Sequence, residues 1–186
     1  ARRSAARTPT TASSSCSSAR VRLRPQIDET MTANEVAEKI LVVNSGSSSL
    51  KYSIFDAESA VSAAHGVVER IGTTGTRLVQ RGPRGERRCE LPHGGHREAF
   101  DAMVRELSAP DTGVLRDAAD IRAVGHRVVH GGERFAQAVV VDDDVLRAIE
   151  ALGPLAPLHN PVNAAGIREA RRVFSTVPHV AVFDTA

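Results

Sequence analysis

One stretch near the start of the chain constrains the fold more than any other: two apolar segments that flank a loop of small polar residues. Residues 40–43 form a continuous apolar run rich in β-branched side chains, which predicts a fully buried strand. Residues 52–55 predict a second strand, and the loop between them contains one glycine and four serines. We therefore expect a hairpin whose strands lie in the core and whose tip is polar.

The tip has the composition of an anion-binding loop. Glycine and serine leave room for backbone N–H groups and hydroxyls to approach a phosphate closely. Lys51 ends the loop, and it is one of only two lysines in a chain with 22 arginines. An ordinary serine-rich hairpin turn is the structural alternative. A Walker loop fits less well, because residues 46–51 lack the second glycine of that motif and its Ser or Thr after the lysine.

Residues 121–132 contain a second informative segment, a predicted buried strand. Its apolar positions are interrupted by His126, Arg127 and His130. An arginine inside an apolar strand is costly unless it is paired or faces a cleft. A structural ion pair with a nearby carboxylate is one interpretation, and a ligand contact is the other. Two glycines after the strand leave its end open to a ligand.

The last eight residues predict another buried strand, which ends in Asp184. A carboxylate at the end of a core strand can reach a cleft; the alternative is the N-cap of a following helix. Residues 154–161 indicate a rigid turn, and Pro161 suits the first position of a helix that runs to about Phe174. His159, within that turn, is by itself more typical of a structural histidine.

Periodicity and turn residues predict the remaining elements. Residues 67–71 and 77–80 indicate strands, residues 81–93 a polar surface turn, and residues 96–108 an amphipathic helix. Residues 139–141 indicate a strand, which three aspartates follow. Those acids could form a metal site, but we interpret them as the cap of the next helix. The order of the elements predicts an α/β domain.

Composition restricts the class of function. A chain of 186 residues with 41% hydrophobic and 25% charged residues is typical of one soluble globular domain. No apolar run approaches the roughly 20 residues that cross a membrane. Residues 1–30 hold six arginines against two acids, so the net charge of +2 comes from this segment and does not indicate nucleic-acid binding. Cys16 and Cys89 give no framework for a disulfide or a metal site.

Residues 1–36 are predicted to be disordered, because they are rich in Arg, Ser and Thr and lack apolar periodicity. The same composition fits an organellar transit peptide. We favour an upstream extension before a natural start at Met31, which leaves residues 37–186 as the folded domain. The extension is expected to be dispensable for folding.

Three segments, in order, resemble the signatures of the acetate kinases. They are VNSGSSSLK at residues 43–51, GHRVVHGG at residues 125–132 and FDTA at residues 183–186, and the APLHNP run at 156–161 also matches. The resemblance covers residues 40–186. It implies an α/β domain of the actin-like ATPase and sugar kinase superfamily, which is ribonuclease H-like, and makes this chain one half of a two-domain fold.

The resemblance also implies a reaction and the roles of matching residues. The reaction is reversible phosphoryl transfer from ATP to acetate, dependent on Mg²⁺ or Mn²⁺, giving acetyl phosphate and ADP. The implied site residues are Asp184 and Arg127 for catalysis; Arg127, Val129, Leu158 and His159 for the substrate; Ser47, Ser49 and Lys51 for ATP; and Asn44 for the metal, through water. Acetate is ionised at neutral pH, so we expect Asp184 to orient groups more than to shuttle a proton.

The family pattern continues beyond Ala186, where further site residues of the family lie. We therefore expect this chain to be a fragment that is inactive alone, and a non-catalytic folded fragment is the competing hypothesis. A propionate or butyrate kinase is the alternative within the family, with Val129 and Leu158 setting the size of the acyl group. The family further implies a cytoplasmic homodimer that binds neither nucleic acid nor membrane.

Overall fold

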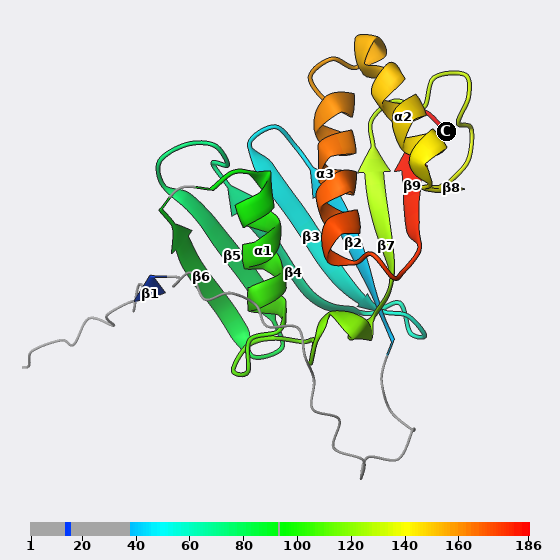
Figure 1. The fold of residues 1–186 in the computed structure, drawn as a ribbon. Helices are drawn as coiled ribbons and strands as arrows, with labels where there is room; N and C mark the ends of the chain where they lie inside the picture. The colour runs from blue at the N-terminus through cyan, green and yellow to red at the C-terminus, as the bar shows by residue number, and fades with distance from the viewer. Residues whose placement is uncertain (1–13, 16–37, 93) are drawn as a thin grey trace, which may run out of the picture.

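The computed structural model describes residues 14–15, 38–92 and 94–186, which form one mixed sheet backed by helices (Figure 1). The sheet has nine strands in the order β1-β6-β5-β4-β3-β2-β7-β9-β8. The strands are β1 (Ser14–Ser15), β2 (Lys39–Ser45), β3 (Ser49–Asp56), β4 (Ser62–Glu69), β5 (Thr76–Gly82), β6 (Gly85–Leu91), β7 (Ile121–Val128), β8 (Val139–Val140) and β9 (His179–Phe183). The predicted α/β order of elements is confirmed.

The strands form two differently connected parts. Strands β2 to β6 make an antiparallel meander, whereas β7 and then β9 continue the sheet parallel to β2. Parallel neighbours need a crossover. The crossovers contain α1 (His96–Leu107), α2 (Asp143–Ala151) and α3 (Asn160–Val173), with short 3₁₀ turns η1 (Ala118–Asp120) and η2 (Gly153–Leu155). The carboxyl ends of β2, β7 and β9 therefore meet at one end of the sheet.

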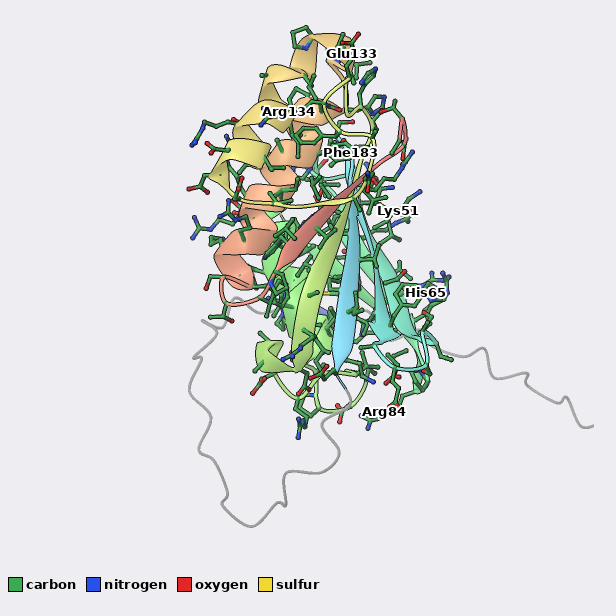
Figure 2. All side chains as sticks on the ribbon, turned by 90° about the vertical axis from the view of Figure 1, so that its right-hand side faces the viewer. Lys51, His65, Arg84, Glu133, Arg134 and Phe183 are labelled. Carbon is green, nitrogen blue, oxygen red and sulfur yellow. The ribbon has the colours of Figure 1, made fainter. Side chains whose placement is uncertain are left out.

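All three α-helices lie on the same face of the sheet, which we call the covered face. They stand in front of it in Figure 1, and Figure 2 shows the opposite, open face without a helix of the described residues. In β2, Leu41 and Val43 are buried beneath the helices, while Val42 is 39% exposed. The prediction of a fully buried strand at residues 40–43 is therefore wrong, because only one face of the sheet has a covering layer.

The core fills the space between the covered face and the helices. Phe100, Met103 and Leu107 of α1 are fully buried there, as are Ile167 and Ala170 of α3. Both amphipathic helices are thus confirmed, and α3 begins one residue before Pro161. No helix in the described part of the chain is long and apolar enough to span a membrane.

The interval predicted as a surface turn, residues 81–93, instead contains a hairpin. Strand β5 continues to Gly82 and β6 begins at Gly85, so only two residues connect them. Cys89 and Leu91 of β6 are buried on the covered face, at a spacing of two that the charged residues around them obscure. The prediction for residues 1–36 lies outside the described residues, except that Ser14–Ser15 pair with β6.

Candidate functional site

The serine-rich segment forms the tip of the β2–β3 hairpin, as expected, but the loop is shorter than its composition indicates. Strand β2 runs to Ser45 and β3 starts at Ser49, so only residues 46–48 lie outside the ladder. Asn44 pairs with Lys51 across the hairpin, and both belong to strands. Polar side chains do not end a strand, because backbone groups make the ladder. Asn44, Ser49 and Lys51 therefore have positions fixed by the sheet.

The loop backbone is held by its carbonyl groups. The carbonyl of Gly46 accepts a hydrogen bond from His96 Nε2 (2.8 Å), and that of Ser48 accepts one from the Ile71 N–H (3.0 Å). By contrast, the amide N–H groups of Ser47 and Ser48 donate to no other residue that the structure describes. Both serines are exposed. The tip thus offers unused donors to an anion.

Arg127 and Asp184 form a bidentate ion pair. Arg127 Nε lies 2.9 Å from Asp184 Oδ1, and Nη2 lies 2.7 Å from Oδ2. The ion pair expected from the structural interpretation of Arg127 is therefore present, and with side chains 52% and 37% exposed it is also accessible to a ligand. Hydrogen bonding and charge from Asp184 raise the pKa of Arg127 above its already high value. The two residues predicted to be catalytic are therefore in direct contact.

Strand register brings the other polar residues into line with this pair. Val43 of β2 pairs with His126 of β7, which places the next residues, Asn44 and Arg127, side by side on the open face. Lys51 stands on the far side of Asn44, and Figure 2 shows it projecting from that face. Two strand spacings put the Lys51 and Arg127 backbones about 10 Å apart. Asn44, Lys51 and Arg127 thus form a polar row across the sheet.

The residues implied for the acyl group are less closely assembled. Val129 is half-buried just after β7, while Leu158 is 75% exposed and His159 is exposed in the turn before α3. No described residue makes a hydrogen bond or ion pair with the His159 side chain. All three lie at the carboxyl end of the sheet, but within the described residues no hydrogen bond or ion pair joins their side chains to Arg127 or Asp184.

Two buried asparagines of α3 were missed by sequence reasoning. Asn160 accepts from the His130 N–H (3.1 Å) and donates to the His130 carbonyl (2.8 Å). Asn163 accepts from the Val129 N–H (3.1 Å) and donates to the Ser45 carbonyl (2.8 Å). The available signal was two amides three residues apart on the apolar face of an amphipathic helix, since buried amides need backbone partners.

His126 lies on the covered face, where its side chain is buried and bonds to another histidine. Its Nε2 is 2.9 Å from His179 Nδ1, and His179 Nε2 is 3.0 Å from the Phe174 carbonyl. The carbonyl requires N–H at His179 Nε2, so His179 Nδ1 accepts and His126 Nε2–H donates. Burial lowers the pKa of His126 to about 3 and also lowers the pKa of His179. Both rings are therefore neutral at physiological pH.

The described residues contain no group of three or more His, Cys, Asp or Glu side chains arranged to hold a metal. The aspartates after β8 cap α2, because Asp142 accepts from the Val145 N–H at 2.7 Å, which confirms the capping interpretation. On the open face, the side-chain amide of Asn44 bonds to no described residue. Asp184, the partner of Arg127, supplies a carboxylate on the same face. Such a sparse set suits Mg²⁺ that keeps waters and phosphate oxygens as its other ligands.

Comparison with known proteins agrees with the sequence resemblance. The family model described as the acetokinase family matches residues 39–186. An acetate kinase from Thermotoga maritima is 49% identical over 148 residues, which are 80% of this chain and 37% of that protein. One from Carboxydothermus hydrogenoformans is 46% identical over 149 residues. The chain thus spans little more than a third of the length of the curated relatives it matches.

Solved structures give the same result. The crystal structure of Porphyromonas gingivalis acetate kinase has a TM-score of 0.77 and 37% identity, covering 81% of this chain and 38% of that one. A propionate kinase from Francisella tularensis has a TM-score of 0.73 and 36% identity, covering 80% and 37%. The mixed sheet with helices on one face fits a domain of the actin-like ATPase fold.

Proposed function

Because the chain belongs to the acetokinase family, we propose that residues 39–186 supply one wall of a site that transfers a phosphoryl group between ATP and acetate. The products in the forward direction are acetyl phosphate and ADP. The observation that carries this proposal is the Arg127–Asp184 pair, exposed on the open face beside Asn44 and Lys51. It combines a carboxylate-binding fork with phosphate-binding groups in one row.

Arg127 binds the acetate carboxylate and offsets charge on the moving phosphoryl group. A guanidinium has five N–H donors, and Asp184 takes one from Nε and one from Nη2. Three donors remain for oxygen atoms of the substrates. Charge-assisted bonds of this kind contribute most where negative charge is concentrated in the transition state.

Asp184 acts chiefly through Arg127. Its two oxygens hold the guanidinium plane at the end of β7, so the remaining donors face a defined direction. An acetate carboxylate has no proton to lose at neutral pH, and a strong general base is not required. Orientation is therefore the role proposed for Asp184.

Ser47, Ser49 and Lys51 meet the ATP phosphates. Exposed loop amides and hydroxyls donate to phosphate oxygens, and the lysine adds a point charge on the open face. Asn44 and Asp184 fit the metal, Mg²⁺ or Mn²⁺, with Asn44 acting through water. When bound, the cation neutralises charge on the phosphates.

Val129, Leu158 and His159 are proposed to border the acyl group. Val129 and Leu158 are apolar and distinguish acyl groups by size. One methylene changes the free energy of binding by only about 1–3 kcal/mol. Propionate or butyrate is the second candidate acceptor, favoured by the structural similarity to a propionate kinase. The whole protein is proposed to be a cytoplasmic homodimer, and this chain alone to be inactive, because one wall cannot exclude water from the reaction.

A chimera tests the proposal. Residues 39–186 replace the matched 148-residue segment of the Thermotoga maritima acetate kinase. Acetyl phosphate formation is measured with acetate, propionate and butyrate. We expect activity that is highest with acetate, and no measurable turnover by the 186-residue chain alone. A folded chimera that is inactive with all three acids would support a non-catalytic role for this chain.

A further inference from the structure

Three carbonyl groups around the β2–β3 hairpin tip point into the protein, each toward a different donor. The Ser45 carbonyl accepts from Asn163 Nδ2, the Gly46 carbonyl accepts from His96 Nε2, and the Ser48 carbonyl accepts from the Ile71 N–H. The distances are 2.8, 2.8 and 3.0 Å. Because a peptide group carries its N–H opposite its C=O, the inward Gly46 carbonyl turns the Ser47 N–H outward. The Gly46 N–H, in the same peptide as the Ser45 carbonyl, donates to the Ser49 carbonyl at 2.7 Å and closes the hairpin.

Two of these donors are side chains from separate helices. His96 is the first residue of α1, and Asn163 lies in the first turn of α3. Both helices lie on the covered face (Figure 1), and the two side chains bond to the tip from that face. The Ser47 and Ser48 N–H groups donate to no described residue, and the Ser47 N–H belongs to the peptide whose carbonyl His96 holds.

Asn163 reaches the tip because α3 lies unusually close to it. A Cβ added at Gly166 would stand 2.1 Å from Ser45 Oγ, so only glycine allows this approach. Asn163 also accepts from the Val129 N–H, two residues after Arg127. The β2–β7 ladder ends at Val43 and His126, and beyond it the Asn163 side-chain amide bridges the two strands. Its position thus links the loop to the strand that carries Arg127.

We propose that His96 and Asn163 are positioning residues that hold the loop at residues 46–48 with the Ser47 and Ser48 N–H groups presented to a phosphate. This inference rests on the proposed function, in which the same loop meets ATP. Neither side chain touches the anion, since both act on loop carbonyls from the covered face. Loss of either donor frees the loop to rotate its peptides and weakens anion binding.

The experiment uses the full 186-residue chain labelled with ¹⁵N. His96→Leu removes the donor, whereas His96→Gln retains a side-chain N–H at similar reach. Asn163→Asp keeps the acceptor for the Val129 N–H and loses the donor to Ser45. Backbone order of residues 46–48 is measured in the free protein. The Ser47 and Ser48 amide shifts are then followed during titration with inorganic phosphate and with ATP, and thermal melts report stability.

We expect an ordered loop in the wild type and in His96→Gln, with order parameters near 0.85, and values below about 0.6 in His96→Leu. Phosphate binding should weaken about fivefold in His96→Leu, because one neutral hydrogen bond is lost. His96→Gln should bind like the wild type. Asn163→Asp should lose loop order as well; if it does not fold, the two His96 variants decide.

Equal loop order and equal affinity in all variants would overturn the inference, and so would identical behaviour of His96→Leu and His96→Gln. A different result would count against the proposed function alone: wild-type amides that respond to neither phosphate nor ATP. In that case the free-protein order parameters still decide whether His96 and Asn163 position the loop.

Discussion

Two neighbouring side chains of β7 bond to residues at the two ends of β9, one within the strand and one just after it, and the two bonds lie on opposite faces of the sheet. On the covered face His126 bonds to His179, and on the open face Arg127 bonds to Asp184. His126 and Arg127 are consecutive residues, so the alternation of a strand alone separates them. The first pair is 3–4% exposed and the second is 37–52% exposed at its side chains.

The difference shows that burial decides what a polar pair can do. Beneath the helices, desolvation lowers the pKa of His126, so the pair stays neutral and supports the fold. On the open face the pair is exposed to solvent, and three Arg127 donors remain free for a ligand. One signature segment therefore contains a residue for stability and, one position later, a residue proposed for catalysis.

The largest effect is expected from breaking the open-face pair in an active enzyme. Arg127→Ala in the chimera should lower kcat by about a hundredfold or more, because a charged contact made chiefly in the transition state is lost. Arg127→Lys should recover little, since one ammonium cannot replace a bidentate fork. Steady-state kinetics and thermal melts on both variants provide the measurement.

A purely structural role for Arg127 makes the opposite forecast. The alanine variant would then melt early, while each folded molecule kept nearly normal turnover. Kinetics normalised to the folded fraction separate the two outcomes.

Breaking the covered-face pair should reduce stability instead. His126→Ala leaves a cavity and removes the donor to His179 Nδ1, which should lower the free energy of unfolding by about 2–4 kcal/mol. Urea denaturation of the 186-residue chain at pH 7.5 measures this. His65→Ala is the matched control, because His65 is exposed on the open face and its loss should change stability by less than about 0.5 kcal/mol (Figure 2). Equal effects of the two variants would show that the histidine pair does not stabilise the fold.

Acid should lower the free energy of unfolding through the covered-face pair, by an amount that the pKa of His126 predicts. The pKa of His126 is about 3 in the folded chain, against about 6.5 when unfolded. The unfolded state thus binds a proton below pH 6.5 that the folded state refuses, so stability is full above that pH and falls as pH drops toward 3. Near pH 5 the loss from this group should be about 2 kcal/mol, and the lowered pKa of His179 acts in the same direction.

His126→Gln removes the titrating group while retaining a donor toward His179. Its stability should therefore depend less on pH between 5 and 7 than that of the wild type. Identical slopes in urea denaturation series would contradict the assignment of this pH dependence to His126.

The smallest effect is expected when the open-face pair is broken in the isolated chain. Arg127→Gln should change the free energy of unfolding by less than about 1 kcal/mol, because exposed ion pairs contribute little. Asp184→Asn should have an equally small effect on the free energy of unfolding, since it removes the same ion pair. Denaturant titration of the two variants checks both values, and a loss of several kcal/mol would mean that the pair supports the fold.

Most elements of the fold could be predicted from periodicity. The helices at α1 and α3 repeat apolar residues every three or four positions, β9 is a short apolar run, and β7 keeps Val124 and Val128 around its polar residues. The hairpin at residues 83–84 was missed, because arginines and glutamates alternate with only two buried residues in β6. Charged side chains on an uncovered face hide the period of a strand.

The sequence by itself determined which residues are proposed to carry the chemistry: the loop serines, Lys51, Arg127 and Asp184 all stand in recognisable segments. Only the tertiary structure decided which of them meet. Arg127 and Asp184 are 57 positions apart, and Asn163 reaches the Ser45 carbonyl over 118 positions. Strand register and helix packing set these contacts, and both depend on the burial of whole faces, which no short segment contains. For the same reason, the sequence shows His126 and Arg127 as two polar residues in one apolar strand. Their burial and their roles differ only once the helices cover one face.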